Sequence, residues 1–150
     1  MQKYNRIVAL DVGSKRTGLA QSDPMHVIAS PIGAFGTLEV IRRLTIIHEQ
    51  EGLHAIVLGW PVGQHGQLGS STDRVVTFAK NLEKALPGVP LRYIDERFTS
   101  VMAREQLRAS GMKKKKRQQK ERIDATAACI ILQEYLDQGE SATMQPVSDS

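Results

Sequence analysis

The sequence of 150 residues predicts an α/β domain with a mixed five-stranded sheet flanked by helices. Three short runs of strand character follow one another early in the chain, separated by breaks too short to hold a helix. Two further apolar runs alternate later with long segments of helical periodicity. Short links join antiparallel strands and helical crossovers join parallel strands, so one sheet should contain both kinds of pairing.

The first three strands are expected to form an antiparallel meander. Residues 6–12, RIVALDV, are rich in aliphatic and β-branched side chains, which favour strands. Strands over residues 16–23 and 26–33 follow after short breaks that contain Gly, Asp and Pro. These residue types are typical of turns, so the links should be tight.

A helix and a buried strand are predicted next. Residues 37–52 form the helix, with Thr37 as its N-cap and Gly52 as its stop signal. The apolar positions at helical spacing are Leu38, Ile41, Leu44 and Ile47. Residues 54–60, HAIVLGW, are continuously apolar, which indicates a strand covered on both faces.

The remaining elements continue the alternation. We expect a polar loop over residues 61–71, a helix over 72–86, a strand over 90–96, and two final helices over 100–110 and 122–138 with a lysine-rich loop between them. Residues 1–138 should therefore form one domain, and residues 139–150, which are polar, a disordered tail.

Composition limits the classes of function. The net charge of +4 and the pI near 9.4 suit a polyanionic partner such as nucleic acid without requiring one. Cys129 is the single cysteine, which excludes an internal disulfide and a cysteine-rich zinc site. The sequence shows neither a signal peptide nor a long apolar span, so we expect a cytoplasmic protein without a membrane partner.

Carboxylates stand at the ends of several predicted elements. Period two places Asp11 on the strand face of Ile7 and Ala9, while Asp95 and Glu96 end the last strand and point to opposite faces. Asp124 lies in the first turn of the final helix, on its apolar side. A carboxylate there needs a partner, which is either an arginine, the amides of the helix N-terminus or a cation.

Four stretches together resemble the motif blocks of a known family. They are ALDVGSKRTGLAQSD, VLGWPVGQHG, YIDERFTS and IDATAACIIL. These blocks are similar to those of the YqgF family, also described as RuvX or as RuvC-like Holliday junction resolvases. Its bacterial members are associated with processing the 5′ end of pre-16S ribosomal RNA. The resemblance covers nearly the whole chain apart from the C-terminal tail.

The resemblance implies a ribonuclease H-like fold and a metal-dependent nuclease. Asp11, Glu96 and Asp124 match the acidic triad of the family, whereas Asp95 is a neighbour of the triad. Two Mg²⁺ or Mn²⁺ ions held by these oxygens would support phosphodiester hydrolysis, with Asp11 as the shared ligand. Trp60, where many members have Leu, and the segment 63–66, which lacks the usual acidic residue, depart from the family pattern.

Several basic residues are candidates for contacting the nucleic-acid backbone. Lys15 and Arg16 follow Asp11 in a turn, although an ordinary solvated hairpin explains them equally well. Arg97 either contacts phosphate or forms a structural ion pair. The lysine-rich run contributes Lys113, Lys114, Lys115, Lys116 and Arg117, either as a solvated loop or as a clamp on the phosphate backbone.

Three alternatives remain open from the sequence. Actin-like ATPases and sugar kinases begin with a similar Asp-x-Gly turn, but they close two such domains around ATP and this chain supplies one. A Holliday junction resolvase should be a stable two-fold dimer, whereas a processor of ribosomal RNA precursor can be a monomer or weak dimer. The third is a non-catalytic RNA-binding module. We expect pre-rRNA, within a small-subunit precursor, as the partner, with branched DNA as the alternative.

Overall fold

The computed structural model describes residues 5–61, 70–95 and 116–145. At the starts of two helices, residues 70–71 and 116–124, the description covers the backbone alone. The predicted helix over 100–110, the first part of the lysine-rich run and most of the predicted loop over 61–71 lie outside these ranges.

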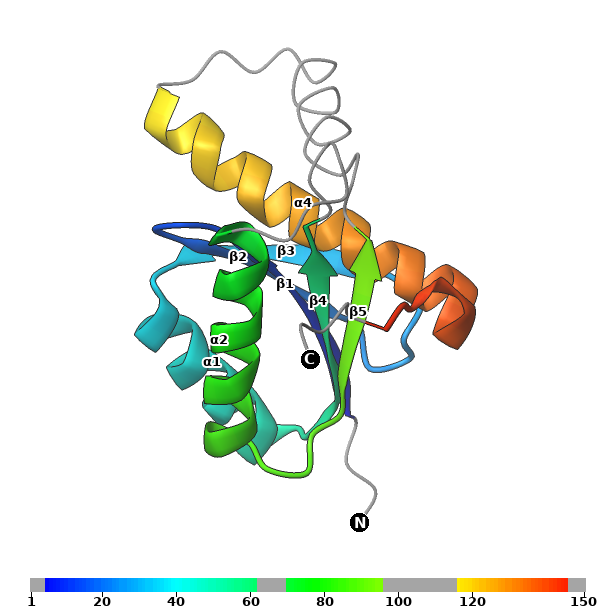
Figure 1. Ribbon diagram of the computed structural model, residues 1–150. Helices are drawn as coiled ribbons and strands as arrows, with labels where there is room; N and C mark the ends of the chain where they lie inside the picture. Colours follow the sequence, from blue (N-terminus) through cyan, green and yellow to red (C-terminus); the bar gives the residue numbers. More distant parts are fainter. Residues whose placement is uncertain (1–4, 62–69, 96–115, 146–150) are drawn as a thin grey trace.

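Five strands form one mixed sheet, as the alternation of elements predicted. The strands are β1 (Arg6–Val12), β2 (Thr17–Ser22), β3 (Ala29–Phe35), β4 (Leu53–Trp60) and β5 (Leu91–Asp95). Their spatial order is β3-β2-β1-β4-β5 (Figure 1). The pairs β1–β2 and β2–β3 are antiparallel, whereas β1–β4 and β4–β5 are parallel. The carboxyl ends of β1, β4 and β5 therefore meet at one edge of the sheet.

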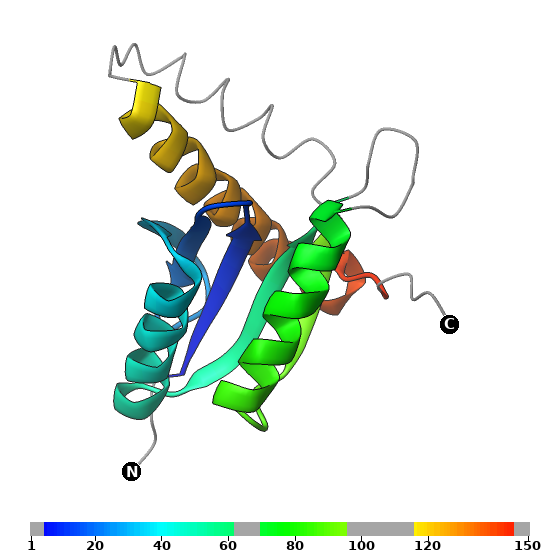
Figure 2. The same ribbon diagram turned by 60° about the vertical axis from the view of Figure 1, so that its left-hand side comes forward.

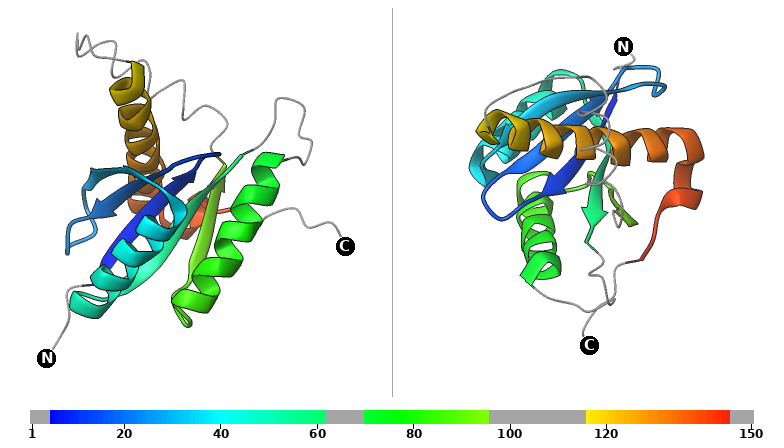
Figure 3. Two further views of the ribbon diagram at one scale, coloured as in Figure 1. Left: turned by 90° about the vertical axis from the view of Figure 1, so that its left-hand side faces the viewer. Right: turned by 90° about the horizontal axis from the view of Figure 1, so that it is seen from above.

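Helices cover both faces of this sheet. They are α1 (Thr37–Gln50), α2 (Ser70–Ala85) and α4 (Lys116–Gln138), followed by the 3₁₀ helix η1 (Gly139–Ala142). In Figure 2, β1 is seen between α1 and α2, which lie on one face, while α4 lies behind the sheet. Figure 3 shows α4 crossing the second face, where it contacts β1, β2, β3 and β4. Within the described residues, no helix is both long and apolar enough to span a membrane.

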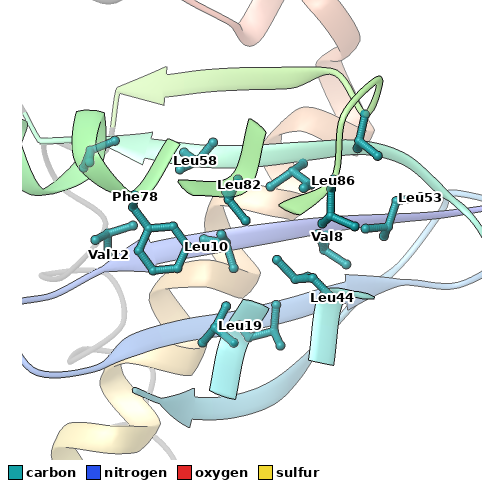
Figure 4. Close-up of a cluster of buried hydrophobic side chains, with 14 of the residues drawn as sticks. Val8, Leu10, Val12, Leu19, Leu44, Leu53, Leu58, Phe78, Leu82 and Leu86 are labelled. Atoms are coloured by element: carbon teal, nitrogen blue, oxygen red, sulfur yellow. The ribbon is translucent and has the colours of Figure 1, made fainter. Parts of the chain in front are cut away.

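The larger hydrophobic core fills the space between the sheet and the pair α1 and α2. Val8 and Leu10 of β1 point into it, together with Leu44 of α1 and Leu82 of α2 (Figure 4). All four side chains are completely buried. Alternation along β1 therefore sends its even-numbered residues, Val12 included, to the face of α1 and α2.

A second, smaller core lies under α4. Ile7 and Ala9 of β1 belong to it, as do Ala128 and Ile131 of α4. The odd-numbered residues of β1 thus face α4. Both faces of the central strands are buried, which is the physical reason why the run over residues 54–60 is apolar throughout.

The ends of α1 differ in one respect from the prediction. Gly36 is the N-cap, and it makes no side-chain hydrogen bond because it has no side chain; Thr37 is the first helical residue. Gly52 does end the helix, as predicted, with its amide bonded to the Ile47 carbonyl at 3.1 Å. Its φ of +88° is a conformation that glycine adopts at little cost.

Helix α4 begins at Lys116, earlier than the predicted start at residue 122. The last part of the lysine-rich run is therefore helical rather than a loop. Lys, Arg, Gln and Glu are all good helix formers, and no Gly or Pro occurs between Lys113 and Gln138. Apolar periodicity detects only the face of a helix that packs on a core, so it located the start too late.

Residues 139–145, the described part of the segment expected to be a disordered tail, form η1 and make further contacts with the domain. Glu140 of η1 accepts hydrogen bonds from Arg92 at 3.1 Å and from the Tyr135 hydroxyl at 2.8 Å. Met144 donates its amide to the Tyr93 carbonyl at 2.8 Å and packs against the larger core. Composition alone misses these contacts because their partners lie far away in the sequence.

Candidate active site

Asp11 lies near the carboxyl end of β1, next to the turn that leads into β2. It stands opposite Gly18 in the antiparallel register and is partly exposed, whereas Leu10 and Val12 on either side are buried. The glycine opposite has no side chain, so no side chain stands across from the Asp11 carboxylate on the paired strand.

Asp11 continues the face of the sheet that α4 covers. Ile7 and Ala9, two and four residues earlier, both belong to the core beneath α4. Since side chains alternate along a strand, Asp11 extends this row beyond the end of the apolar core. This confirms the face that period two predicted for it.

Helix α4 runs so that its earlier residues lie toward the same end of the sheet as Asp11. Gln133 holds the start of β3, where its Nε2 donates to the Val27 carbonyl at 3.0 Å and its Oε1 accepts from the Ala29 amide at 2.9 Å. The start of β3 and the carboxyl end of β1 are at opposite ends of the sheet. The α4 backbone at Asp124, one turn before Ala128, is therefore displaced toward the end that carries Asp11.

Asp95 also ends a strand at this edge, but on the other face. In β5, Ile94 belongs to the core beneath α4 and Tyr93 packs against the core of α1 and α2. Alternation therefore assigns Asp95 to the side of Tyr93, opposite to Asp11. Glu96, the predicted triad member that follows, lies outside the described residues, and so does the side chain of Asp124.

The turn between β1 and β2 places two cations close to Asp11. The Gly13 amide donates to the Arg16 carbonyl at 2.9 Å, which closes the turn. A Cβ atom on Gly13 would lie 2.5 Å from that carbonyl oxygen, so the turn requires glycine there. Lys15 is exposed and Arg16 partly exposed, as expected for residues that meet a phosphate or solvent.

Comparison with known proteins identifies the family of this chain. Residues 5–138 match the family model RuvX, described as "Holliday junction resolvase". The chain belongs to the RuvX family. This confirms the resemblance found in the sequence motifs.

Relatives and solved structures agree with this assignment. A "Putative pre-16S rRNA nuclease" from Bacteroides fragilis is 41% identical over 133 residues, covering 89% of this chain and 96% of that protein. One of the same name from Chlorobaculum tepidum is 38% identical, covering 89% and 94%. Thermus thermophilus RuvC, solved in complex with a Holliday junction substrate, superposes with a TM-score of 0.58 at 13% identity, covering 93% and 99%. The RuvX chain therefore has the ribonuclease H-like fold of RuvC.

The donor chemistry at Asp11 is compatible with a hard divalent cation. Carboxylate oxygens are the ligands that Mg²⁺ and Mn²⁺ prefer, and a partly exposed strand end admits both an ion and a substrate. In the part of the RuvX chain that the structure describes, no three His, Cys, Asp or Glu side chains converge as a metal site. Asp11 is the member of the predicted triad whose side chain is described.

Most of the predicted phosphate contacts fall outside the described side chains. Arg97 and Lys113–Lys115 lie outside the described residues altogether. Lys116 and Arg117 occupy the first turn of α4, where the backbone alone is described. Lys15 and Arg16 are thus the predicted contacts that the structure places beside Asp11.

The carboxylates with a lowered pKa have structural partners. The pKa of Asp23 is lowered chiefly by a hydrogen bond from the Ile28 amide, and that of Glu39 by Arg42. Burial raises the pKa of the Cys129 thiol, which keeps it protonated and unreactive at neutral pH. The hydrogen bonds behind the two lowered pKa values stabilise the β2–β3 loop and α1.

A group of polar residues on α2 was not among the functional residues predicted from the sequence. Asp73, Arg74, Thr77 and Asn81 line a pocket at the same end of the sheet, on the face opposite to α4. Their spacing follows one side of a helix, so a polar stripe on the predicted helix over residues 72–86 was the available signal. Its neighbours from the β1–β2 turn are separated from it in sequence, and only the fold brings them together.

Proposed function

We propose that this RuvX chain is a divalent-metal-dependent endonuclease that processes the 5′ end of pre-16S ribosomal RNA. The observation that carries the proposal is the position of Asp11, a partly exposed carboxylate at the end of the central strand, on the face crossed by α4. The names of the relatives that are 38% and 41% identical support ribosomal RNA as the substrate.

Asp11, Glu96 and Asp124 would hold the metal ions. Asp11 lies near the carboxyl end of β1, Glu96 follows β5 in the sequence, and Asp124 lies on α4, so the proposed ligands come from three separate segments of the chain. The sequence predicts that Asp95 and Glu96 point to opposite faces. When bound, Mg²⁺ or Mn²⁺ ions supply water activation and neutralise charge on the phosphate.

The reaction is the hydrolysis of one phosphodiester bond. The oxygen of a water molecule forms a new bond to phosphorus, the bond from phosphorus to the leaving oxygen breaks, and that oxygen takes up a proton. One product then ends in a phosphate and the other in a hydroxyl. Lys15 and Arg16 in the turn after Asp11 would hold a neighbouring phosphate and so position the strand.

Cleavage of two substrates tests this proposal. A precursor ribosomal RNA fragment and a synthetic four-way DNA junction would each be incubated with Mg²⁺, with Mn²⁺ or with EDTA. Wild type would be compared with Asp11→Asn, and with Asp95→Asn as the matched control on the opposite face. We expect metal-dependent cleavage of the RNA that Asp11→Asn abolishes and Asp95→Asn retains.

The other outcomes would contradict the proposal in different ways. Cleavage of the junction alone would make the chain a resolvase. If neither substrate were cut while wild type and Asp11→Asn bound RNA equally and with strong salt dependence, the chain would be a binding module. Cleavage that survives in Asp11→Asn would place the active site elsewhere.

A further inference from the structure

A second site lies at the carboxyl end of the sheet, on the face opposite to Asp11. It is a pocket of about 340 Å³ between the β1–β2 turn, the start of α1 and residues 73–81 of α2. Its lining residues are Val12, Gly13, Ser14, Thr37, Asp73, Arg74, Thr77, Phe78 and Asn81. Pockets of this size accommodate small organic groups.

The pocket combines an apolar wall with several kinds of polar group. Val12 and Phe78 are buried parts of the larger core and form the apolar wall. Asn81 can both donate and accept hydrogen bonds, and Arg74 can only donate. Hydroxyls of Ser14, Thr37 and Thr77 and the Asp73 carboxylate complete the polar groups. The hydroxyls, the carboxylate and the amide can pair with a base edge and a sugar, and the Arg74 guanidinium can donate to a base or to a phosphate, so the set as a whole suits a nucleotide.

The pocket is close to Asp11 although it opens on the other face. Gly13 lines the pocket and is two residues from Asp11, so their Cα atoms are at most about 7 Å apart. Asp11 and Val12 are consecutive, and their side chains alternate between the two faces. A strand of nucleic acid that crosses the end of the sheet over the β1–β2 turn would therefore pass both the carboxylate and the pocket.

We propose that this pocket binds one nucleotide of the substrate strand, adjacent to the bond cleaved beside Asp11. The proposal deepens the proposed function, because it assigns a subsite for the same substrate. Lys15 and Arg16 belong to the same β1–β2 turn as Gly13 and Ser14 of the pocket, so they are candidates to hold the phosphate that links the two nucleotides. A free nucleotide has the same chemistry, so the test must separate the two sources.

Binding without cleavage tests the subsite independently of catalysis. Short RNA strands with one abasic position, moved stepwise along the sequence, would be titrated in EDTA against the full chain. The proteins would be Asp11→Asn alone and Asp11→Asn with Thr77→Ala and Asn81→Ala. Alanine favours helix, so the two changes on α2 should leave the fold intact, as circular dichroism would check. Val76→Ala, outside the pocket on the same helix, is the matched control.

We expect the double change on α2 to weaken binding of the intact strand about tenfold, the effect of losing two hydrogen bonds. An abasic position at one point of the strand should weaken binding to Asp11→Asn by a similar factor. The same abasic strand should bind the α2 variant about as well as the intact strand does, because that variant has already lost the contacts with the base. Val76→Ala should bind like its parent. Ser14→Ala, from a different element, should show a smaller loss of the same kind.

Two results would overturn the proposal. If the ratio of the two proteins' affinities is the same for every abasic strand as for the intact strand, the base does not enter this pocket. If a 5′-mononucleotide saturates the pocket while binding of the strand is unchanged by the α2 variant, the pocket serves a free nucleotide instead. Neither result depends on metal or on cleavage, so failure of the subsite is distinguishable from failure of the nuclease.

Discussion

Asp11 and Asp95 end two parallel strands of the same sheet but belong to opposite faces. Asp11 extends the row of Ala9 under α4, whereas Asp95 follows Tyr93 on the side of α1 and α2. Side chains on opposite faces of a sheet point away from each other, which disfavours binding of one ion by both carboxylates. A metal site at this edge should therefore use Asp11 together with residues from the α4 side.

Metal binding should stabilise the folded chain through Asp11. An ion that binds only the native state adds about 2.7 kcal/mol to the free energy of unfolding at one hundred times its Kd. For a chain of this size, that corresponds to a rise in Tm of about 5 to 10 °C. Thermal unfolding with increasing Mg²⁺ or Mn²⁺ would show the rise in wild type and Asp95→Asn, and none in Asp11→Asn. A rise in Asp11→Asn of the same size would contradict the site.

Lys15→Ala should reduce the salt dependence of RNA binding. Each phosphate contact to a single strand contributes about 0.7 to the slope of log K against log salt concentration. We expect the slope to fall by about that amount, measured by fluorescence anisotropy at several salt concentrations. Lys84→Ala, in the last turn of α2 at the other end of the sheet, is the control and should keep the wild-type slope.

Truncation of Leu10 should destabilise the chain strongly. Leu10 is completely buried between β1 and the helices α1 and α2, so Leu10→Ala leaves a cavity and should cost about 2–5 kcal/mol. Leu38 on α1 is 85% exposed, and Leu38→Ala should change the free energy of unfolding by less than about 0.5 kcal/mol. Urea denaturation measures both, and equal losses would contradict the assignment of the core.

The same substitution at two glycines should have opposite effects. Gly13→Ser places a Cβ 2.5 Å from the Arg16 carbonyl oxygen and should cost about 1–3 kcal/mol of stability. Gly36→Ser meets open space at the N-cap of α1, where a serine hydroxyl can accept from a first-turn amide. It should add a few tenths, roughly 0.2–0.5 kcal/mol. Urea denaturation would distinguish the two, and a neutral Gly13→Ser would contradict the close approach in the turn.

The contact of η1 with β5 should weaken in acid. Hydrogen bonds from Tyr135 and Arg92 hold the pKa of Glu140 below its ordinary value of 4.5. A lowered pKa stabilises the fold above pH 4.5, and this contribution is lost as pH falls through the folded-state pKa. Glu140→Gln should therefore have a lower Tm than wild type at pH 7 and the same Tm in sufficiently strong acid. Tyr135→Phe should show a smaller effect of the same sign, and a constant difference in Tm at every pH would contradict this origin.

Local patterns were sufficient to predict the sheet. Period two along β1 predicted the face of Asp11, and short links against helical crossovers predicted which strands pair antiparallel. These properties are local because side-chain alternation and link length are encoded within a few residues. The motif blocks that identified the family are also short contiguous stretches of sequence.

Contacts between distant segments were beyond those patterns. The pocket joins the β1–β2 turn to α2, and residues 139–145 pack on the domain because Glu140 contacts Arg92 and Met144 contacts Tyr93. The early start of α4 was not predicted either, because apolar periodicity indicates only the part of a helix that packs on the core. The sequence by itself determined the order of the elements along the chain, the mixed pairing of the sheet, the face of Asp11 and the family. Only the tertiary structure decided which polar groups meet across the end of the sheet, because that depends on how separate elements pack.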